Sequence, residues 1–162
     1  MSQELSHVPA GFHSVTPSLT CRDAGAALDF YTQAFGAVEL YRLAEPGSGK
    51  IMHAEMRIGN STIMLSDEYP DWGCLAPAFG QGASFMIYVP DADAAFAQAV
   101  AAGATGMQPV MDQFWGDRTG RLACPFGYRW SVAQKVRDVP PEEITRLAAE
   151  WKPTCPDAAQ TA

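Results

Sequence analysis

The feature that most constrains this chain is an internal repeat. Its first half places an alternating run before Asp23, apolar residues at helical spacing, and then Gly36; its second half repeats this order around Asp91 and Gly103. The aspartates lie 68 residues apart and the glycines 67 apart. An Asp accepts hydrogen bonds from a first helical turn, and a Gly suits a left-handed C-terminal cap. Each half therefore predicts a strand, a helix and a glycine stop.

Three short β-like runs follow each predicted helix. They cover 38–43, 51–58 and 61–66 in the first half, with Gly59-Asn60 as a tight turn, and 107–111, 118–123 and 129–134 in the second. Together with leading strands at 15–20 and 84–89, they predict two βαβββ modules, at about 12–68 and 83–135. The expected fold is α+β: an open, curved mixed sheet around a cavity, with helices on the outer face.

A chain of 162 residues favours one domain. We expect it to span 1–152, with an added helix at about 140–151 and a flexible tail at 153–162. The four cysteines lack metal or disulfide spacing, so unpaired thiols are expected. The sequence contains no membrane-length apolar window and no secretory leader, which predicts a cytoplasmic protein.

The balance of charge limits the partners. The chain has 18 acidic and 11 basic residues and a net charge of −7, which disfavours nucleic acid and anionic membranes. A neutral or cationic small molecule fits this charge better.

The two faces of each strand can be separated because side chains alternate. Val15, Leu19, Met56 and Ile58 belong to the set expected under the helices. The set expected to face the cavity mixes hydroxyls with Met, Tyr, Leu and a few charges: Thr16, Ser18, Thr20, His53, Glu55, Arg57, Ile63, Leu65, Ser84, Met86, Tyr88, Arg129, Ser131 and Ala133. Such a mixture is typical of a ligand site, although a solvated or dimer-packed face remains an alternative.

Five segments carry a family resemblance, and together they cover about 13–135: VTPSLTCRDAGAALDFYTQAFGA, KIMHAEMRIGNSTIMLSDE, YVPDADAAFAQAVAAGAT, DQFWGDRTGRL and CPFGYRWSVA. This part of the chain resembles the vicinal oxygen chelate superfamily, which includes glyoxalase I, extradiol dioxygenases, fosfomycin-resistance enzymes and bleomycin-binding proteins. The strings are most similar to its PhnB-like branch. The resemblance implies two modules that each contribute half of an open sheet, and a homodimer.

The resemblance also implies where a metal would bind. The superfamily's metal enzymes place one ligand near the middle of four inner strands, at positions that correspond here to Thr16, Leu65, Ser84 and Ser131. None of these is a histidine or a carboxylate, the ligands that a catalytic divalent ion requires. We therefore expect no metal and no other cofactor.

Two polar sets remain as candidates for chemistry. His53 and Glu55 share one strand face and form half a metal site, an acid/base pair or a surface pair. Asp67 and Glu68 keep a shifted metal site open. Arg57 either pairs with Glu55 or orients an anionic group.

Aromatic side chains mark two loops. Phe114 and Trp115 lie in a Gly-containing loop, where they either cap the cavity and stack on a planar ligand or form a structural turn with Asp117 paired to Arg118. Trp72, in the connection at 69–82, is either part of a lid or part of a subunit interface.

These patterns predict a metal-free protein that binds or sequesters an apolar or aromatic small molecule, such as an antibiotic or secondary metabolite. The expected ligand-binding residues are Thr16, Ser18, His53, Glu55, Arg57, Leu65, Met86, Tyr88, Phe114, Trp115 and Ser131. The alternative is an enzyme with His53 and Glu55 as weak catalytic candidates, either a metal-dependent lyase or dioxygenase or a metal-free isomerase or cyclase. A third reading is a dimer whose cavity is incidental.

Overall fold

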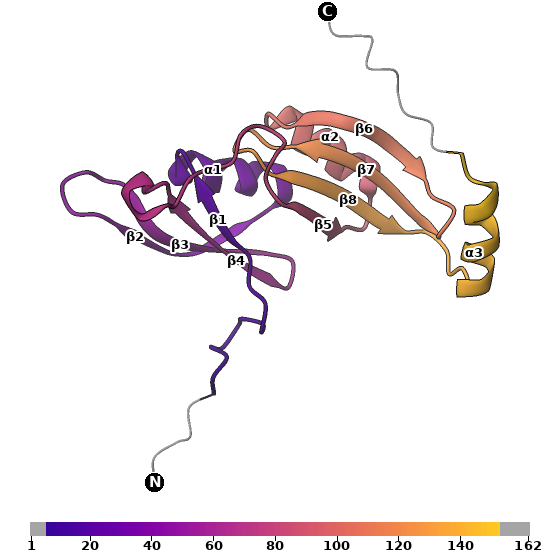
Figure 1. The fold of residues 1–162 in the computed structure, drawn as a ribbon, viewed down its shortest axis with the longest axis horizontal. Coiled ribbons are helices and arrows are strands. Elements are labelled where there is room, and N and C mark those ends of the chain that lie inside the picture. The colour runs from indigo at the N-terminus through magenta and orange to yellow at the C-terminus, as the bar shows by residue number, and fades with distance from the viewer. Residues whose placement is uncertain (1–5, 153–162) are drawn as a thin grey trace, which may run out of the picture.

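A computed structural model describes residues 6–152, which form two four-stranded mixed sheets and three α-helices (Figure 1). The first module contains β1 (Ser18–Cys21), α1 (Ala24–Phe35), β2 (Val38–Ala44), β3 (Ile51–Ile58) and β4 (Ser61–Asp67). After the short 3₁₀ helix η1 (Pro70–Trp72), the second contains β5 (Ser84–Tyr88), α2 (Ala92–Ala101), β6 (Thr105–Asp112), β7 (Asp117–Ala123) and β8 (Arg129–Lys135). The helix α3 (Pro141–Glu150) follows.

Both sheets have the same topology. The strand orders are β1-β4-β3-β2 and β5-β8-β7-β6, with the first and last strands of each module parallel and the other neighbours antiparallel. The prediction of two βαβββ modules in an α+β fold is confirmed. Neither sheet closes into a barrel, so each keeps two free edges.

The helices begin and end largely where the repeat predicted. The carboxylates of Asp23 and Asp91 accept hydrogen bonds from the amides of Ala26 and Ala94, and Gly36 ends α1 with a φ of 65° in the left-handed region. The cap of α2 differs by one residue, because Ala102 is its C-cap and Gly103 follows with a φ of 115°.

A second capping device is shared by the modules and was not predicted. Buried Asp67, at the end of β4, accepts hydrogen bonds from the amides of Ala24 and Ile51, at 2.7 and 2.6 Å. At the end of β8, the Gln134 side chain accepts one from the amide of Ala92 at 3.2 Å. In each module, the last strand therefore holds the first turn of the helix.

The core continues from one module into the other. The helix α1 contributes Tyr31 and Phe35, whose rings lie 5.4 and 5.0 Å from that of Trp130 on β8. The two helices also contact each other, and the Gln98 side chain donates to the carbonyl oxygen of Gln33. Burial of large aromatic rings across this boundary holds the modules together.

One side chain bridges the modules through hydrogen bonds. The Tyr128 hydroxyl, in the β7–β8 turn, donates to the Thr20 carbonyl oxygen at 3.0 Å and accepts from the Thr20 amide at 2.9 Å. Thr20 lies on β1, whose other edge pairs with β4. A phenol thus satisfies backbone groups that a further strand would otherwise satisfy.

The predicted first strand is too long at its start. Strand β1 begins at Ser18, and Val15 is 86% exposed instead of packed under a helix. Pro17 has no amide hydrogen, and the Thr16 hydroxyl bonds back to the His13 carbonyl oxygen, so the chain turns before it can join the sheet.

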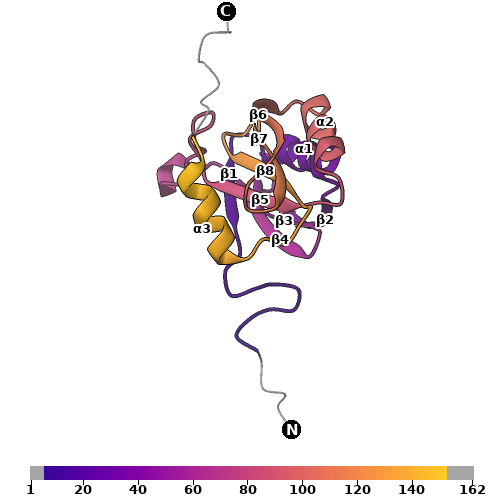
Figure 2. The same ribbon diagram turned by 90° about the vertical axis from the view of Figure 1, so that its right-hand side faces the viewer.

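The two long faces of the molecule differ. In Figure 1 both α1 and α2 lie behind the sheets, and Figure 2 shows them on one side with α3 on the other. The sheet sides without α1 and α2 are called the open faces below. Within residues 6–152, no helix is long and apolar enough to cross a membrane. The predicted tail at 153–162 and Cys155 lie outside the described residues.

Candidate functional site

Cross-strand partners define the open face of the first module. Glu55 on β3 lies between Tyr41 on β2 and Met64 on β4, and Met64 in turn lies beside Ser18 on β1. His53 and Arg57 share the face of Glu55 because they are two residues away along β3. Of the predicted ligand-binding residues, this face gathers Ser18, His53, Glu55 and Arg57, whereas Thr16 lies before β1 in the turn described above.

His53 and Glu55 contact each other directly. The His53 Nε2 atom lies 3.1 Å from a Glu55 carboxylate oxygen, with 35% and 23% of the two side chains exposed. The Tyr41 ring lies 6.2 Å from the imidazole. Arg57 forms no ion pair with Glu55, so that predicted alternative is wrong. The dyad can exchange a proton or a hydrogen bond with a group placed against this face.

Leu65 does not belong to the open face, and its predicted role is wrong. It lies opposite Ala54 and is 1% exposed in the core beneath α1, as is its neighbour on the same face, Ile63. The residues of β4 that face the opening are Met64 and Ser66, because they flank Leu65 on the alternating strand. Neither Met64 nor Ser66 is a histidine or a carboxylate, so exchanging Leu65 for them adds no metal ligand to the open face.

The shifted metal site is also not formed. Both carboxylate oxygens of Asp67 are occupied by backbone amides on the helix side, and the Glu68 side chain accepts from the Ala76 amide. No group of three or more His, Cys, Asp or Glu side chains within residues 6–152 is arranged to hold a metal ion. The donor set therefore does not fit the metal that the superfamily's enzymes use.

The open face of the second module carries a hydrogen-bonded cluster centred on Asp117. One oxygen of this buried carboxylate accepts from the Tyr88 hydroxyl and from the Trp115 Nε1 atom, both at 3.2 Å, and its other oxygen lies 3.9 Å from the Lys135 Nζ atom. The hydrogen bond from Tyr88 to Asp117 raises the pKa of Tyr88. The predicted Asp117–Arg118 pair is wrong, because Arg118 bonds Asp93 and Asp112 on the helix side.

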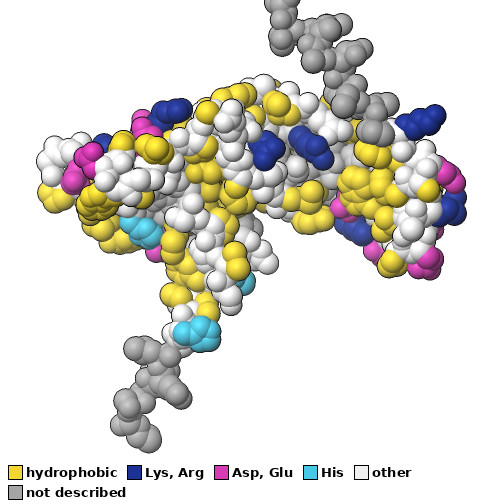
Figure 3. Space-filling model, in the orientation of Figure 1, with side chains coloured by type: hydrophobic (Ala, Val, Ile, Leu, Met, Phe, Trp, Pro, Cys, Tyr) yellow, Lys and Arg dark blue, Asp and Glu magenta, His cyan; other side chains and the backbone are white. Residues whose placement is uncertain are grey.

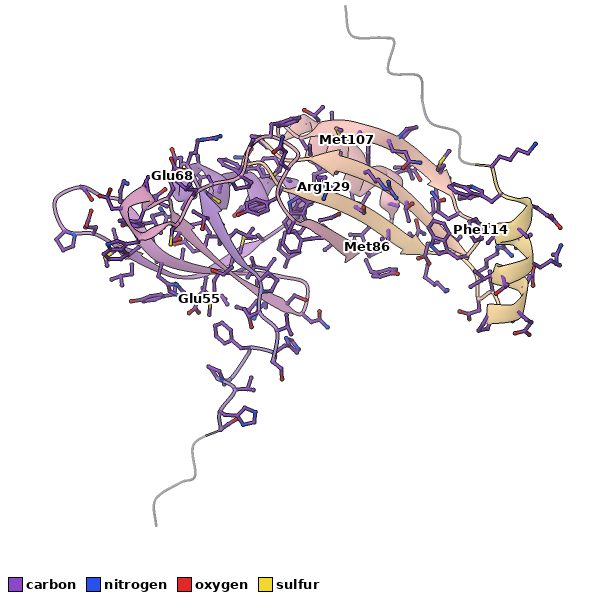
Figure 4. All side chains as sticks on the ribbon, viewed as in Figure 1. Glu55, Glu68, Met86, Met107, Phe114 and Arg129 are labelled. Atoms are coloured by element: carbon purple, nitrogen blue, oxygen red, sulfur yellow. The ribbon has the colours of Figure 1, made fainter. Side chains whose placement is uncertain are left out.

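The aromatic loop forms the turn between β6 and β7. The Phe114 ring lies 4.9 Å from that of Trp115 and 5.9 Å from that of Trp151, just after α3. Figure 4 places Phe114 beside α3, at the end of the molecule away from Glu55. Trp115 thus borders the open face of the second module through Asp117, whereas Phe114 packs at its end.

The connection between the modules carries Trp72 at the other end of the molecule. Its ring stacks on Tyr69, at 5.5 Å, and the Lys50 ammonium lies over the Tyr69 ring. Trp72 itself is 76% exposed. A lid and a subunit interface both stay predictions for this residue.

A hollow lies where the modules meet. A groove of about 810 Å³ is bordered by the C-terminal end of α1, the β3–β4 turn, β5 and the first half of α2. The consecutive residues Met86 to Asp91 all line it, so it follows the free edge of β5 instead of one face. An adjoining hollow of about 390 Å³ shares Met86, Ile87, Ile58, Asn60 and Ser61 with it.

The structure brings only part of the predicted site together. Met86 and Tyr88 line the groove, and Ser131 lies beside Met86 on the open face. His53 and Glu55 lie on the other module and do not line it. The sequence did not predict that Asn60 and Asp91 line the groove. Asn60 was interpreted only as a turn residue and Asp91 only as a helix cap, and these local roles gave no reason to expect a further one.

Two βαβββ modules with open sheet faces define the class of protein to which the chain is related. Residues 11–132 match the family model described as the Glyoxalase/Bleomycin resistance protein/Dioxygenase superfamily, so the chain belongs to that superfamily. The match begins before β1 and ends within β8, so it does not include α3.

Known relatives agree with this assignment. The uncharacterized protein Rv0887c of Mycobacterium tuberculosis (strain ATCC 25618 / H37Rv) is 43% identical over 136 residues, covering 81% of this chain and 79% of that protein. The crystal structure of TioX from Micromonospora sp. ML1 matches with a TM-score of 0.60 and 27% identity, over 76% of this chain and 99% of TioX. A PhnB protein from Bacillus cereus, at 18% identity and a TM-score of 0.58, shares the fold over 75% of this chain and 99% of its own.

Proposed function

We propose that this protein binds an apolar or aromatic small molecule without a metal, in the groove along β5 and on the adjoining open face of the second module. The observation that carries the proposal is the groove itself. Its volume of about 810 Å³ is within the range of about 300–1,000 Å³ that small-molecule sites occupy. Met86 and Tyr88, 51% and 64% exposed, supply apolar surface at the junction of groove and face.

The donor set supports binding over metal-assisted chemistry. After the correction on β4, the positions that correspond to the metal ligands of the family's enzymes hold Met64 and the hydroxyl side chains of Thr16, Ser84 and Ser131, with Thr16 in the turn before β1. Such side chains bind divalent ions poorly without carboxylates or imidazoles. Sequestration of a ligand needs only a complementary surface, which these side chains offer.

A homodimer is part of the proposal. Every residue of the edge strand β2 is exposed, including Val38, Leu40, Tyr41 and Leu43. Figure 3 shows hydrophobic side chains spread over the open faces. Exposed apolar surface of this extent is typical of an interface, and a second copy would cover it and enclose the ligand.

The test uses the full chain and the neutral fluorescent probe N-phenyl-1-naphthylamine. We expect saturable binding, weakened at least about tenfold by Met86→Glu because a carboxylate opposes an apolar ligand. Met52→Glu is the matched control, because Met52 is 41% exposed on β3 and lines neither hollow. Equal loss in both variants, or no binding by the unmodified protein, would refute the proposed site.

Native mass spectrometry with metal analysis of the same sample tests the remaining parts. We expect a dimer, carrying an organic adduct when the protein is purified from its own cells. A stoichiometric metal that His53→Ala removes would overturn metal-free binding, and a monomer at micromolar concentration would overturn the dimer.

The contact of 3.1 Å between His53 and Glu55 favours a second candidate, a metal-free isomerase or cyclase with this dyad as general base. The compound released from the purified protein distinguishes the two. If fresh protein returns it unchanged, binding is supported; if protein converts it and Glu55→Gln does not, the enzyme is supported.

A further inference from the structure

Two arginines lie side by side on the open face of the second module. Arg121 on β7 is paired with Ser131 on β8, and Arg129 on β8 is paired with Ala123 on β7, so the arginines are diagonal neighbours on one face. Such neighbours lie about 7–8 Å apart. Both are exposed. Figure 4 labels Arg129 near the start of β8, and Figure 3 shows basic side chains gathered over this part of the open face.

The other basic side chains of this module have protein partners. Arg118 bonds Asp93 and Asp112, Lys135 lies near Asp117 and Asp138, and Arg137 donates to the Phe114 carbonyl oxygen. By contrast, no carboxylate within residues 6–152 lies within 4.0 Å of Arg121 or Arg129. Acidic residues outnumber basic ones in this chain, 18 to 11, so a shortage of acids does not explain the difference.

Two adjacent cations without a counter-charge repel each other and destabilise the sheet. Paired guanidinium groups offer rigid forks of N–H donors that match the oxygens of a carboxylate, sulfonate or phosphate. The arrangement is therefore suited to an anion supplied from outside the chain.

Neighbouring residues connect the two arginines to the groove along β5. Ser131 lies opposite Arg121, and Ser84 on β5 lies beside Arg129, so two hydroxyls adjoin the arginines on the same face. Met86 lies beside Ser131 and lines the groove along β5. A ligand whose apolar body occupies the groove can thus extend its anionic end toward Arg121 and Arg129.

We propose that Arg121 and Arg129 bind an oxyanion of the ligand, so that the ligand class is an apolar or aromatic compound with one carboxylate-like group. This inference rests on the proposed binding function and narrows its ligand. It also departs from the neutral or cationic ligand that the net charge suggested, because local charge on the open face is opposite in sign to the total.

The test compares two probes that share the N-phenylnaphthylamine framework. One is 1-anilinonaphthalene-8-sulfonate, which carries an oxyanion, and the other is neutral N-phenyl-1-naphthylamine. We expect the double variant Arg121→Gln, Arg129→Gln to weaken sulfonate binding about tenfold and to change neutral binding less than twofold, because only the sulfonate loses charge-assisted hydrogen bonds.

The control variant is Arg146→Gln on α3, where an exposed arginine pairs with Glu150. It should change the affinity for either probe less than twofold, which separates a local contact from a general effect of net charge. Circular dichroism confirms that each variant is folded.

Two kinds of failure are distinguishable. If the double variant weakens both probes equally, or leaves sulfonate binding within twofold of the unmodified protein, the anion site is refuted while the groove stands. If the neutral probe binds neither the unmodified protein nor any variant, the proposed binding function is refuted. This holds whether or not the sulfonate probe binds.

Discussion

Tyr128 offers the sharpest test of how the two modules are held together. The variant Tyr128→Phe keeps the ring and removes the hydroxyl that bonds both backbone groups of Thr20, at 2.9 and 3.0 Å. Each neutral hydrogen bond contributes about 1 kcal/mol net, so losing both should lower the free energy of unfolding by ~2 kcal/mol. For a protein of this size, that loss corresponds to a melting temperature lower by roughly 4–8 °C.

The assay is urea unfolding followed by circular dichroism and tryptophan fluorescence. Tyr41→Phe is the matched control, because Tyr41 is 49% exposed and its hydroxyl forms no hydrogen bond within the described residues. It should change stability by less than about 0.5 kcal/mol. A Tyr128→Phe loss as small as that of the control would refute the bridge as a stabilising contact.

Three further predictions concern other contacts. Asp67→Ala should lower the free energy of urea unfolding by about 3 kcal/mol, because two buried amides lose a charged acceptor. Gln134→Ala removes one neutral hydrogen bond and should lower it by about 1 kcal/mol. A larger loss for Gln134→Ala than for Asp67→Ala would contradict the capping argument. Burial raises the pKa of Cys21 from 9.0 to about 12. Because the folded state holds this proton more tightly, stability should be full below pH 9 and fall by about 1.4 kcal/mol per pH unit toward pH 12. Cys21→Ala should flatten that fall and exposed Cys74→Ala should not; equal profiles would exclude Cys21 as the cause. Trp115→Ala should weaken binding of N-phenyl-1-naphthylamine about fivefold while lowering stability by about 1 kcal/mol, and unchanged affinity would remove the aromatic turn from the site.

Local signals explain why the architecture could be predicted. Caps such as Asp23 and Asp91 act within one helical turn, and strands such as Ile51–Ile58 are bounded by their own turn residues. The helix Pro141–Glu150 also follows from its own proline and acidic first turn. Where the determining contacts lie within a few residues, the pattern alone was sufficient.

Apart from the start of β1, which Thr16 and Pro17 decide locally, the errors arise where distant contacts decide the outcome. Strand β4 has apolar residues on both faces, and only the position of α1 above Leu65 assigns its buried side. Asp67 has the chemistry of a metal ligand, but its oxygens are used by amides from α1 and β3. The groove along β5 is lined by residues of both modules, so it depends on how the modules pack. The residue pattern of a single strand cannot predict that packing.

The repeat itself indicates where the two modules have diverged. Met64 and Ser131 are equivalent positions 67 residues apart, so their cross-strand partners, Glu55 and Arg121, are equivalent too. Core positions keep their character, as buried Leu65 and Val132 illustrate, and the helix-capping role is kept by Asp67 and Gln134. On the open faces, by contrast, the matched pair Glu55 and Arg121 carries opposite charges. Because packing constrains the core and the caps more than the open faces, the charge at this pair is free to differ between the modules, which supports the proposal of an anion site on the second module alone.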